Sequence, residues 1–141
     1  FFPEACDYLA DNKNDIVALS EPLTGTTVAK YKALAAENNI WLSLGGLHER
    51  QPENTEKVLN THIIINDRGE IVAAYRKIHL FDMENKETGV RLMESDFALA
   101  GREIVPPVSS PIGKIGLSIV SFDFVKLTFC QGSKEDSNEF P

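Results

Sequence analysis

Three charged side chains lie beside apolar residues and could together perform acid–base chemistry. Glu4 follows an apolar pair of residues, and Glu94 lies within an apolar stretch of a long loop. Lys77 lies in the segment Tyr75–Leu80, where the alternation of a strand would place it on the face opposite Arg76. A carboxylate can accept and return a proton, and a lysine cation can stabilise an oxyanion. Because a single Glu, Lys or Arg is usually solvated at the surface, each residue alone predicts no function.

The spacing of apolar residues predicts the elements that would position these side chains. Apolar residues at helical intervals predict an amphipathic helix over Thr27–Asn38, with threonines as N-cap candidates and asparagines as its stop. A short apolar strand, Ile40–Leu44, follows directly and is expected to end at Gly45 and Gly46. A helix that runs into a buried strand is typical of a layered α/β protein.

A hairpin and a final strand complete the expected sheet. The hairpin joins Val58–Asn66 to Glu70–Leu80 through an Asn-Asp-Arg-Gly turn, which favours one residue at positive φ. A long loop then leads to a strand expected over Lys114–Phe124. In an α/β sheet, chemistry is usually found at the strand ends and the loops that leave them.

The composition disfavours several classes of protein. The 141 residues carry a net charge of −7 with dispersed Lys and Arg, so we expect no nucleic-acid partner. No apolar run approaches the roughly 20 residues that span a bilayer, so we expect no membrane association. Cys6 and Cys130 are too few for a disulfide framework or a zinc site, which predicts free thiols and no metal. We expect a cytoplasmic protein, with mitochondria as the alternative because a targeting segment would precede Phe1.

Several motifs, in their order and approximate spacing, resemble the nitrilase superfamily of carbon–nitrogen hydrolases. Those shared with the whole superfamily are Phe2-Pro3-Glu4, Tyr75–Leu80, Met93–Ser95 and Gly113–Leu117. Those most similar to its deaminated-glutathione amidase branch are Leu19–Leu23 and Trp41–Arg50. The resemblance covers Phe1 to about Ile119 and implies part of an αββα four-layer sandwich, incomplete at both ends. It also implies a homo-oligomer for the full-length form and no metal or organic cofactor.

The resemblance also implies a role for each charged residue. In this family a cysteine thiolate attacks a small linear amide, such as deaminated glutathione. Glu4 would be the general base, Lys77 the cation that stabilises the oxyanion, and Glu94 the group that orients Lys77 and the substrate. Arg50 could bind a substrate carboxylate bidentately. A buried lysine between two carboxylates keeps its charge because the opposite charges offset the cost of burial.

The expected cysteine is missing from its place after Ile119. Without a gap, Val120 occupies that position and cannot attack; with a one-residue insertion, Ser121 stands there, and a hydroxyl is a much poorer nucleophile. Cys130 lies too far along the chain to replace it. We interpret residues 1–119 as a partial carbon–nitrogen hydrolase domain and 120–141 as a divergent tail. As a hypothesis, the tail is translated intron, and a spliced transcript that still encodes it would refute this.

These observations leave several interpretations open. The chain is either an amidase of this branch or a catalytically inactive fragment or subunit that retains the sheet, and the absent thiol favours inactivity for the chain as written. An omega-amidase-type enzyme or another nitrilase-branch hydrolase is a further alternative. An unrelated α/β binding domain is disfavoured by four motifs occurring in order.

Overall fold

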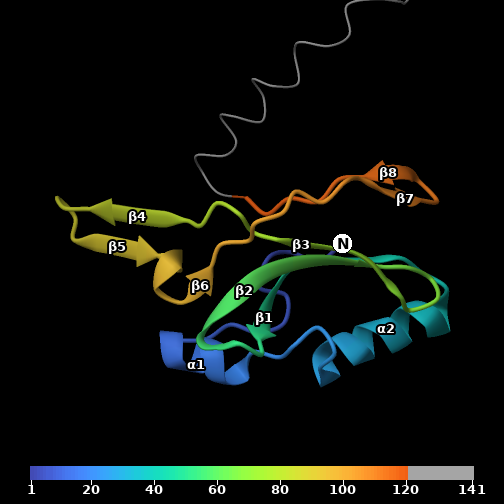
Figure 1. The fold of residues 1–141 in the computed structure, drawn as a ribbon, viewed down its shortest axis with the longest axis horizontal. Helices are drawn as coiled ribbons and strands as arrows, with labels where there is room; N and C mark the ends of the chain where they lie inside the picture. Colours follow the sequence, from blue (N-terminus) through green and yellow to red (C-terminus); the bar gives the residue numbers. More distant parts are fainter. Residues whose placement is uncertain (121–141) are drawn as a thin grey trace, which may run out of the picture.

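The computed structural model describes residues 1–120 and is built around one twisted sheet (Figure 1). The sheet is flanked by two helices and two short hairpins. The elements in chain order are α1 (Lys13–Leu19), α2 (Thr26–Asn38), β1 (Leu42–Gln51), β2 (Asn54–Ile65), β3 (Ile71–Arg76), β4 (Asp82–Asn85), β5 (Val90–Met93), the 3₁₀ helix η1 (Glu94–Asp96), β6 (Ala98–Leu99), β7 (Val108–Ser110) and β8 (Gly113–Ile115).

The central strand of the sheet is β2, which pairs antiparallel with β1 on one side and β3 on the other. Its first half, at Val58 and Leu59, also pairs in parallel with β6. The turn between β2 and β3 has Gly69 at φ +74°, so the expected hairpin and its positive-φ residue are confirmed. This hairpin brings the end of β3 beside the middle of β2.

The two faces of the sheet hold separate apolar clusters. On one face, Ala35 of α2 packs with Leu44 and Ile63, all fully buried. On the other, Ile64 packs with Leu117 of the segment that follows β8. Neighbouring residues of β2 enter opposite clusters because side chains alternate along a strand. Burying each such aliphatic side chain stabilises the fold by roughly 1.5–3 kcal/mol.

Helix α2 occurs where the sequence predicts it, but its N-terminus is capped differently. It ends at Asn39, which adopts the left-handed conformation at φ 52°. The N-cap is Gly25 rather than a threonine, and it supplies no side-chain hydrogen bond. Instead, the carboxylate of Glu21 accepts from the backbone N–H and the hydroxyl of Thr27, at 2.9 and 3.0 Å. The Glu21 carboxylate, which lies before the N-cap in sequence, thus accepts a backbone N–H of the first turn that a threonine side chain was expected to cap.

Other sequence-based boundaries were wrong. Strand β1 does not end at Gly45 and Gly46 but runs through them to Gln51, with an irregular register between Leu44 and Leu47. Strand β3 ends at Arg76, so the following residue already lies outside the strand.

The C-terminal part of the described chain also differs from expectation. The long loop contains the β4–β5 hairpin, which projects from one end of the molecule in Figure 1. The last expected strand is reduced to β8, residues 116–120 lie in no strand, and residues 121–124 lie outside the described part of the chain. Helix α1 was not foreseen at all. No helix in residues 1–120 is long and apolar enough to cross a membrane.

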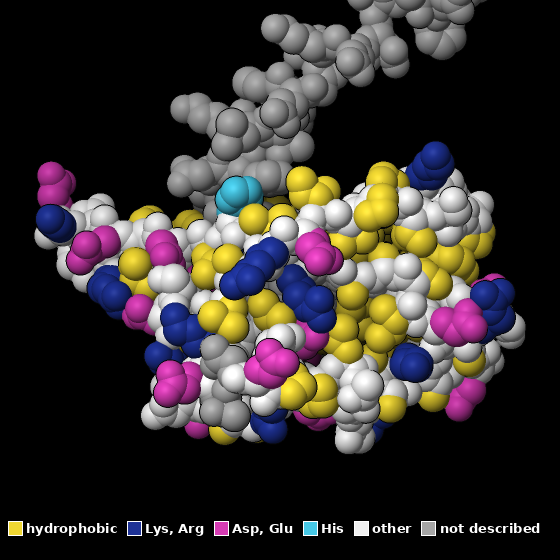
Figure 2. Space-filling model, in the orientation of Figure 1, with side chains coloured by type: hydrophobic (Ala, Val, Ile, Leu, Met, Phe, Trp, Pro, Cys, Tyr) yellow, Lys and Arg dark blue, Asp and Glu magenta, His cyan; other side chains and the backbone are white. Residues whose placement is uncertain are grey.

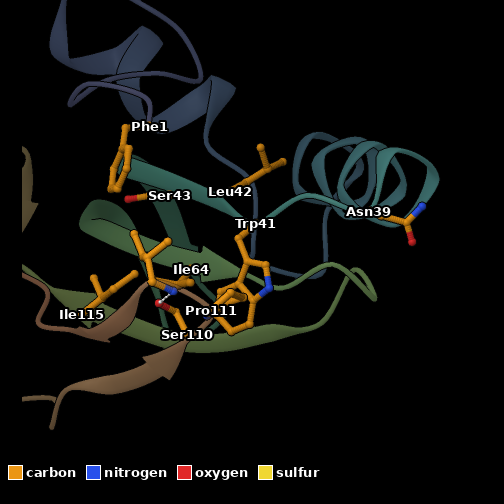
Figure 3. Close-up of a pocket in the computed structure, with 10 residues that line it drawn as sticks. Phe1, Asn39, Trp41, Leu42, Ser43, Ile64, Ser110, Pro111 and Ile115 are labelled. Carbon is orange, nitrogen blue, oxygen red and sulfur yellow. Dashed lines mark hydrogen bonds between the residues drawn. The ribbon is translucent and has the colours of Figure 1, made fainter.

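An apolar pocket lies between the sheet and the β7–β8 hairpin (Figure 3). It has a volume of about 360 Å³ and is lined by side chains such as Trp41, Ile64 and Ile115. The buried Nε1–H of Trp41 has no hydrogen-bond partner among the described residues. Figure 2 shows a large area of apolar side chains toward this end of the molecule, while Lys, Arg, Asp and Glu side chains lie at both ends.

Candidate active site

Glu4, Lys77 and Glu94 meet in one cleft near the base of the β4–β5 hairpin. The Nζ of Lys77 lies 3.2 Å from Glu4 Oε1 and 2.9 Å from Glu94 Oε2. The lysine side chain is 3% exposed and that of Glu94 is 9% exposed, whereas that of Glu4 is 45% exposed. A buried cation is therefore held between one buried carboxylate and one that still faces solvent.

The backbone around Lys77 is fixed by hydrogen bonds on both sides. Its N–H donates to the carbonyl of Asn60 on β2 at 2.8 Å, and its carbonyl accepts from Gly101 N–H at 2.8 Å. Since β3 ends one residue earlier, Lys77 leaves the strand while still attached to the sheet. Its side chain can then turn into the cleft rather than stand on a face of the sheet.

Glu94 closes the base of the β4–β5 hairpin. Its backbone N–H donates to the carbonyl of Phe81 at 3.0 Å, and its Oε2 accepts from Phe81 N–H at 2.7 Å. The residue begins the 3₁₀ helix η1 directly after β5. The hairpin therefore fixes both the backbone and the carboxylate of Glu94.

Glu4 is delivered by a segment that runs close to two glycines of β1. Phe2 N–H donates to Ser43 O at 2.8 Å, and Gly45 N–H donates to Phe2 O at 3.1 Å. A Cβ at Gly45 would lie 2.5 Å from Phe2 O, and one at Gly46 would lie 2.9 Å from Glu4 Cγ. Phe2 pairs in parallel with Leu44, so these glycines let the Glu4 segment lie close alongside β1 and do not mark a strand end.

Substitution of Gly45 tests this close approach. Gly45→Ala is expected to displace the Glu4 segment and to destabilise the protein by about 1–3 kcal/mol, because the new methyl group overlaps a backbone carbonyl that cannot rotate away. Gly116→Ala is the matched control, since a Cβ there meets nothing within 4 Å. Thermal unfolding of both variants measures the effect, and an equal melting temperature for the two would contradict it.

A second attachment of the Glu4 segment is the pair Asp7 and His48. Asp7 accepts from His48 N–H at 2.7 Å and lies 2.9 Å from His48 Nδ1. Tyr8 stacks on the His48 ring, with the centroids 4.5 Å apart. Burial would raise the pKa of Asp7, but the hydrogen bonds from His48 and from Tyr8 N–H outweigh burial and lower it below its usual value.

The lowered pKa of Asp7 predicts an acid-labile attachment. The unfolded chain binds this proton more readily than the folded one, so the Asp7 contribution is fully present above the ordinary pKa of 3.8 and is lost as the pH falls through the folded value. Asp7→Asn should therefore cost stability at neutral pH, with a difference from the parent chain that shrinks below about pH 4. Urea unfolding across that range measures it; a difference that does not depend on pH would refute the assignment.

Asn60 is a member of the cleft that the sequence analysis missed. Its Nδ2 donates to Glu4 Oε1 at 2.5 Å and to Glu94 Oε1 at 3.1 Å. The sequence signal for Asn60 is weak, because it is only the first of three consecutive polar residues between the apolar ends of the β2 segment that starts at Val58. The amide group thus joins the two carboxylates that also share the lysine.

Val120 lines the same cleft, at the position where the sequence analysis expected a cysteine. The cleft has a volume of about 390 Å³, and the other residues that line it are Glu4, Ala5, Asn60, Lys77, Phe81, Leu92, Met93, Glu94 and Phe97. Val120 is 63% exposed, so a side chain there is open to solvent. Among the lining residues in the described part of the chain none is a cysteine. The alternative nucleophile Ser121, like Cys130, lies outside the described residues.

Arg50 is not brought to this cleft. Its Nη2 donates to the carbonyl of Ala18 at 2.8 Å and its Nε to Ser20 Oγ at 3.2 Å, at the end of α1. A cation at a helix C-terminus interacts favourably with the last carbonyls. The observed geometry therefore gives Arg50 a structural contact, and its expected role toward a substrate carboxylate has no support here.

Arg76 forms an ion pair with the buried Glu49 on the opposite side of the sheet, and its own side chain is 41% exposed. Its Nη2 and Nε donate to the two carboxylate oxygens of Glu49 at 2.7 and 2.8 Å. Thr61 Oγ1 also donates to Glu49 Oε2, at 2.7 Å. Arg76 and Lys77, the adjacent cations at the end of β3, are thus both paired with carboxylates. Of the two, only Lys77 faces the cleft.

Known proteins match both this sequence and this fold. The sequence profile described as "Carbon-nitrogen hydrolase" matches residues 1–125. Deaminated glutathione amidase of Rattus norvegicus is 43% identical over 140 residues, which covers 96% of this chain and 42% of that protein.

Two crystal structures give the fold. The NitFhit protein of Caenorhabditis elegans superposes with a TM-score of 0.74 at 46% identity, covering 84% of this chain and 28% of the other. Nit3 of Saccharomyces cerevisiae, a member of branch 10 of the nitrilase superfamily, gives a TM-score of 0.60 at 24% identity and covers 81% of this chain and 38% of the other. The expected α/β class and nitrilase-type fold are confirmed, and the chain spans less than half the length of these proteins.

Proposed function

Since this chain belongs to the carbon–nitrogen hydrolase family, we propose that its cleft is built to hydrolyse a small linear amide such as deaminated glutathione. The observation that carries the proposal is Lys77, held 3.2 Å from Glu4 and 2.9 Å from Glu94. A buried cation with a solvent-facing carboxylate beside it is suited to amide hydrolysis by a thiol. The choice of deaminated glutathione rests on the name of the rat relative.

Each of these groups would have a different role in the reaction. A thiol placed at position 120, where this chain has Val120, would lose its proton to Glu4 while its sulfur forms a bond to the amide carbon. The carbonyl oxygen becomes an oxyanion, which the Lys77 cation stabilises. When the carbon–nitrogen bond breaks, Glu4 returns the proton to the leaving nitrogen and ammonia departs. Water, deprotonated by Glu4, then hydrolyses the thioester and restores the thiol.

Glu94 would act through Lys77 rather than on the substrate. Its Oε2 lies 2.9 Å from Lys77 Nζ, and its side chain is only 9% exposed. Two carboxylates around one lysine also offset the cost of burying that cation. The full-length protein would use the same groups in a homo-oligomer, as the family resemblance implies.

A second candidate function is that of a catalytically inactive member of the family. The specific observation is Val120, a hydrocarbon side chain that lines the cleft where the nucleophile would be. Such a chain would keep the sheet, and the charged cluster could still bind an amide without cleaving it. We favour this state for the sequence as written, with residues 120–141 as a divergent tail. An omega-amidase-type or other nitrilase-branch hydrolase stays the third alternative.

Ammonia release from deaminated glutathione distinguishes the candidates. The chain as written is compared with a version in which the sequence from Val120 onward is replaced by a Cys-Tyr-Asp continuation typical of the family. Release by the replaced version alone would support a complete acid–base site that lacks its nucleophile. Release by the chain as written would show that another residue attacks, and release by neither would refute the amidase proposal.

A further inference from the structure

We propose that Asn60 is a positioning residue that makes the two carboxylates of the cleft unequal and leaves Glu4 Oε2 as the oxygen that accepts protons. This inference rests on the proposed function, because it deepens the role of Glu4 in the same site. Asn60 would not touch the reacting atoms. It would act by determining which carboxylate oxygens already accept a hydrogen bond.

The amide group of Asn60 can donate two hydrogen bonds, and both are used within the cleft. One goes to Glu4 Oε1 at 2.5 Å and the other to Glu94 Oε1 at 3.1 Å. The backbone carbonyl of the same residue accepts from Lys77 N–H at 2.8 Å. Asn60 is therefore hydrogen-bonded to all three charged residues of the site. Its amide group donates to the two glutamates, and its carbonyl accepts from the backbone of Lys77.

The hydrogen bonds to the carboxylate oxygens separate the two glutamates. In Glu94, Oε1 accepts from Asn60, and Oε2 accepts from Phe81 N–H and lies 2.9 Å from Lys77 Nζ in an ion pair. In Glu4, Oε1 takes both the lysine and the amide, and Oε2 has no partner among the described residues. A general base needs a free oxygen within reach of the proton that it takes. Only Glu4 has one, and its side chain is also the more exposed of the two.

The position of the Asn60 side chain is itself restricted. Strand β2 holds its backbone in register with His48 of β1. A Cβ at Gly46 would lie 2.8 Å from Asn60 Oδ1, so the glycine gives the amide the room that it occupies. An amide also suits this place because it donates twice and does not titrate. Without it, Glu4 could rotate and pair either oxygen with Lys77.

The first test follows the carboxyl groups without the Val120→Cys change and needs no catalysis. At neutral pH, the carboxyl-carbon NMR signals of glutamate-labelled protein are compared in the parent, Asn60→Ala and Thr61→Val. Removing the Asn60 donors should change the chemical shifts of the Glu4 and Glu94 carboxyl carbons, because each carboxylate loses a hydrogen bond to one oxygen. Thr61→Val is the matched control, since Thr61 is the next residue of β2 and donates to Glu49 on the other side of the sheet. Unchanged Glu4 and Glu94 carboxyl signals in Asn60→Ala would overturn the inference.

The second test asks whether this positioning matters for proton transfer. In the Val120→Cys background, the burst of nitrophenolate from p-nitrophenyl acetate reports acylation of the introduced thiol, which peptide mass mapping locates. Asn60→Ala is expected to slow the burst by about 10- to 100-fold, as for other losses of a positioning group. Asn60→Ser keeps one donor and should have an intermediate burst rate, while Thr61→Val should leave the burst rate unchanged.

The outcomes separate this inference from the proposed function. If Glu4→Gln slows the burst but Asn60→Ala does not, the positioning role is refuted and the function stands. If Asn60→Ala exposes Cys6 to acylation as strongly as it slows position 120, the effect is unfolding and the positioning role is again refuted. If Glu4→Gln has no effect, the proposed function fails, and the NMR comparison alone decides whether Asn60 positions the carboxylates.

Discussion

Chains carrying Val120→Cys are expected to be acylated rapidly at position 120 by p-nitrophenyl acetate, whereas the parent chain releases nitrophenolate only at the background rate of its own cysteines. The reason is geometric: Val120 lines the cleft that holds Glu4 and Lys77, and it is 63% exposed. A thiol there would have a base and an oxyanion-stabilising cation as neighbours. Burst kinetics with peptide mass mapping measure the effect.

Glu4 supplies the larger part of the expected rate. In the Val120→Cys background, Glu4→Gln should slow acylation by about 10²- to 10⁴-fold, the range for loss of a positioned general base. Glu37→Gln is the control, because Glu37 lies exposed on α2, away from the cleft. Equal rates for the two glutamine variants, or acylation at position 120 no faster than at Cys6, would remove Glu4 from the mechanism.

Local patterns in the sequence predict the parts of the fold that depend on neighbours in the chain. Helix α2 was expected within one residue of its observed start because apolar residues recur at helical spacing. The β2–β3 hairpin followed from two apolar runs and a turn with a single positive-φ glycine. Each of these signals lies within a few residues of the structure that it specifies.

The features that the sequence analysis missed depend on residues that are distant in the chain. Gly45 was taken as a strand end, but a glycine is needed because Phe2 pairs closely alongside β1 there. The β4–β5 hairpin has a strand, Asp82–Asn85, that is exposed throughout, so it carries no alternation of apolar residues that could have revealed it. Pairing between strands at the surface leaves little trace in composition.

The site was predictable only in part, and for the same reason. Glu4 and Lys77 are 73 residues apart, and nothing in their local sequence predicts that their side chains meet. They were singled out through family motifs rather than through physical pattern. Asn60 belongs to none of those motifs and is one polar residue in a buried strand. Its partners become evident only when β2 is placed beside the Glu4 segment and the hairpin base.

Removing the charge of Lys77 is expected to be the most destabilising change in the cleft. Lys77→Met leaves Glu94 buried without its cation, and breaking a buried ion pair from one side costs about 3–5 kcal/mol. Arg68→Met is the surface counterpart, because Arg68 and Glu70 are 73% and 58% exposed at a separation of 2.8 Å. That change should leave the free energy of unfolding nearly unchanged, because solvent screens an ion pair this exposed. Urea unfolding of both variants gives the two free energies.

The source of the Lys77 effect can be isolated by removing its partner as well. If the cost comes from an uncompensated buried charge, Glu94→Gln in the Lys77→Met background should restore part of the lost stability, because the amide needs no cation. Additive losses in the double variant would mean that Lys77 stabilises the fold through packing of its stem. In that case the contribution of Lys77 to the free energy of unfolding would come from its packing, and its ion pairs with the two carboxylates would matter for the reaction rather than for stability.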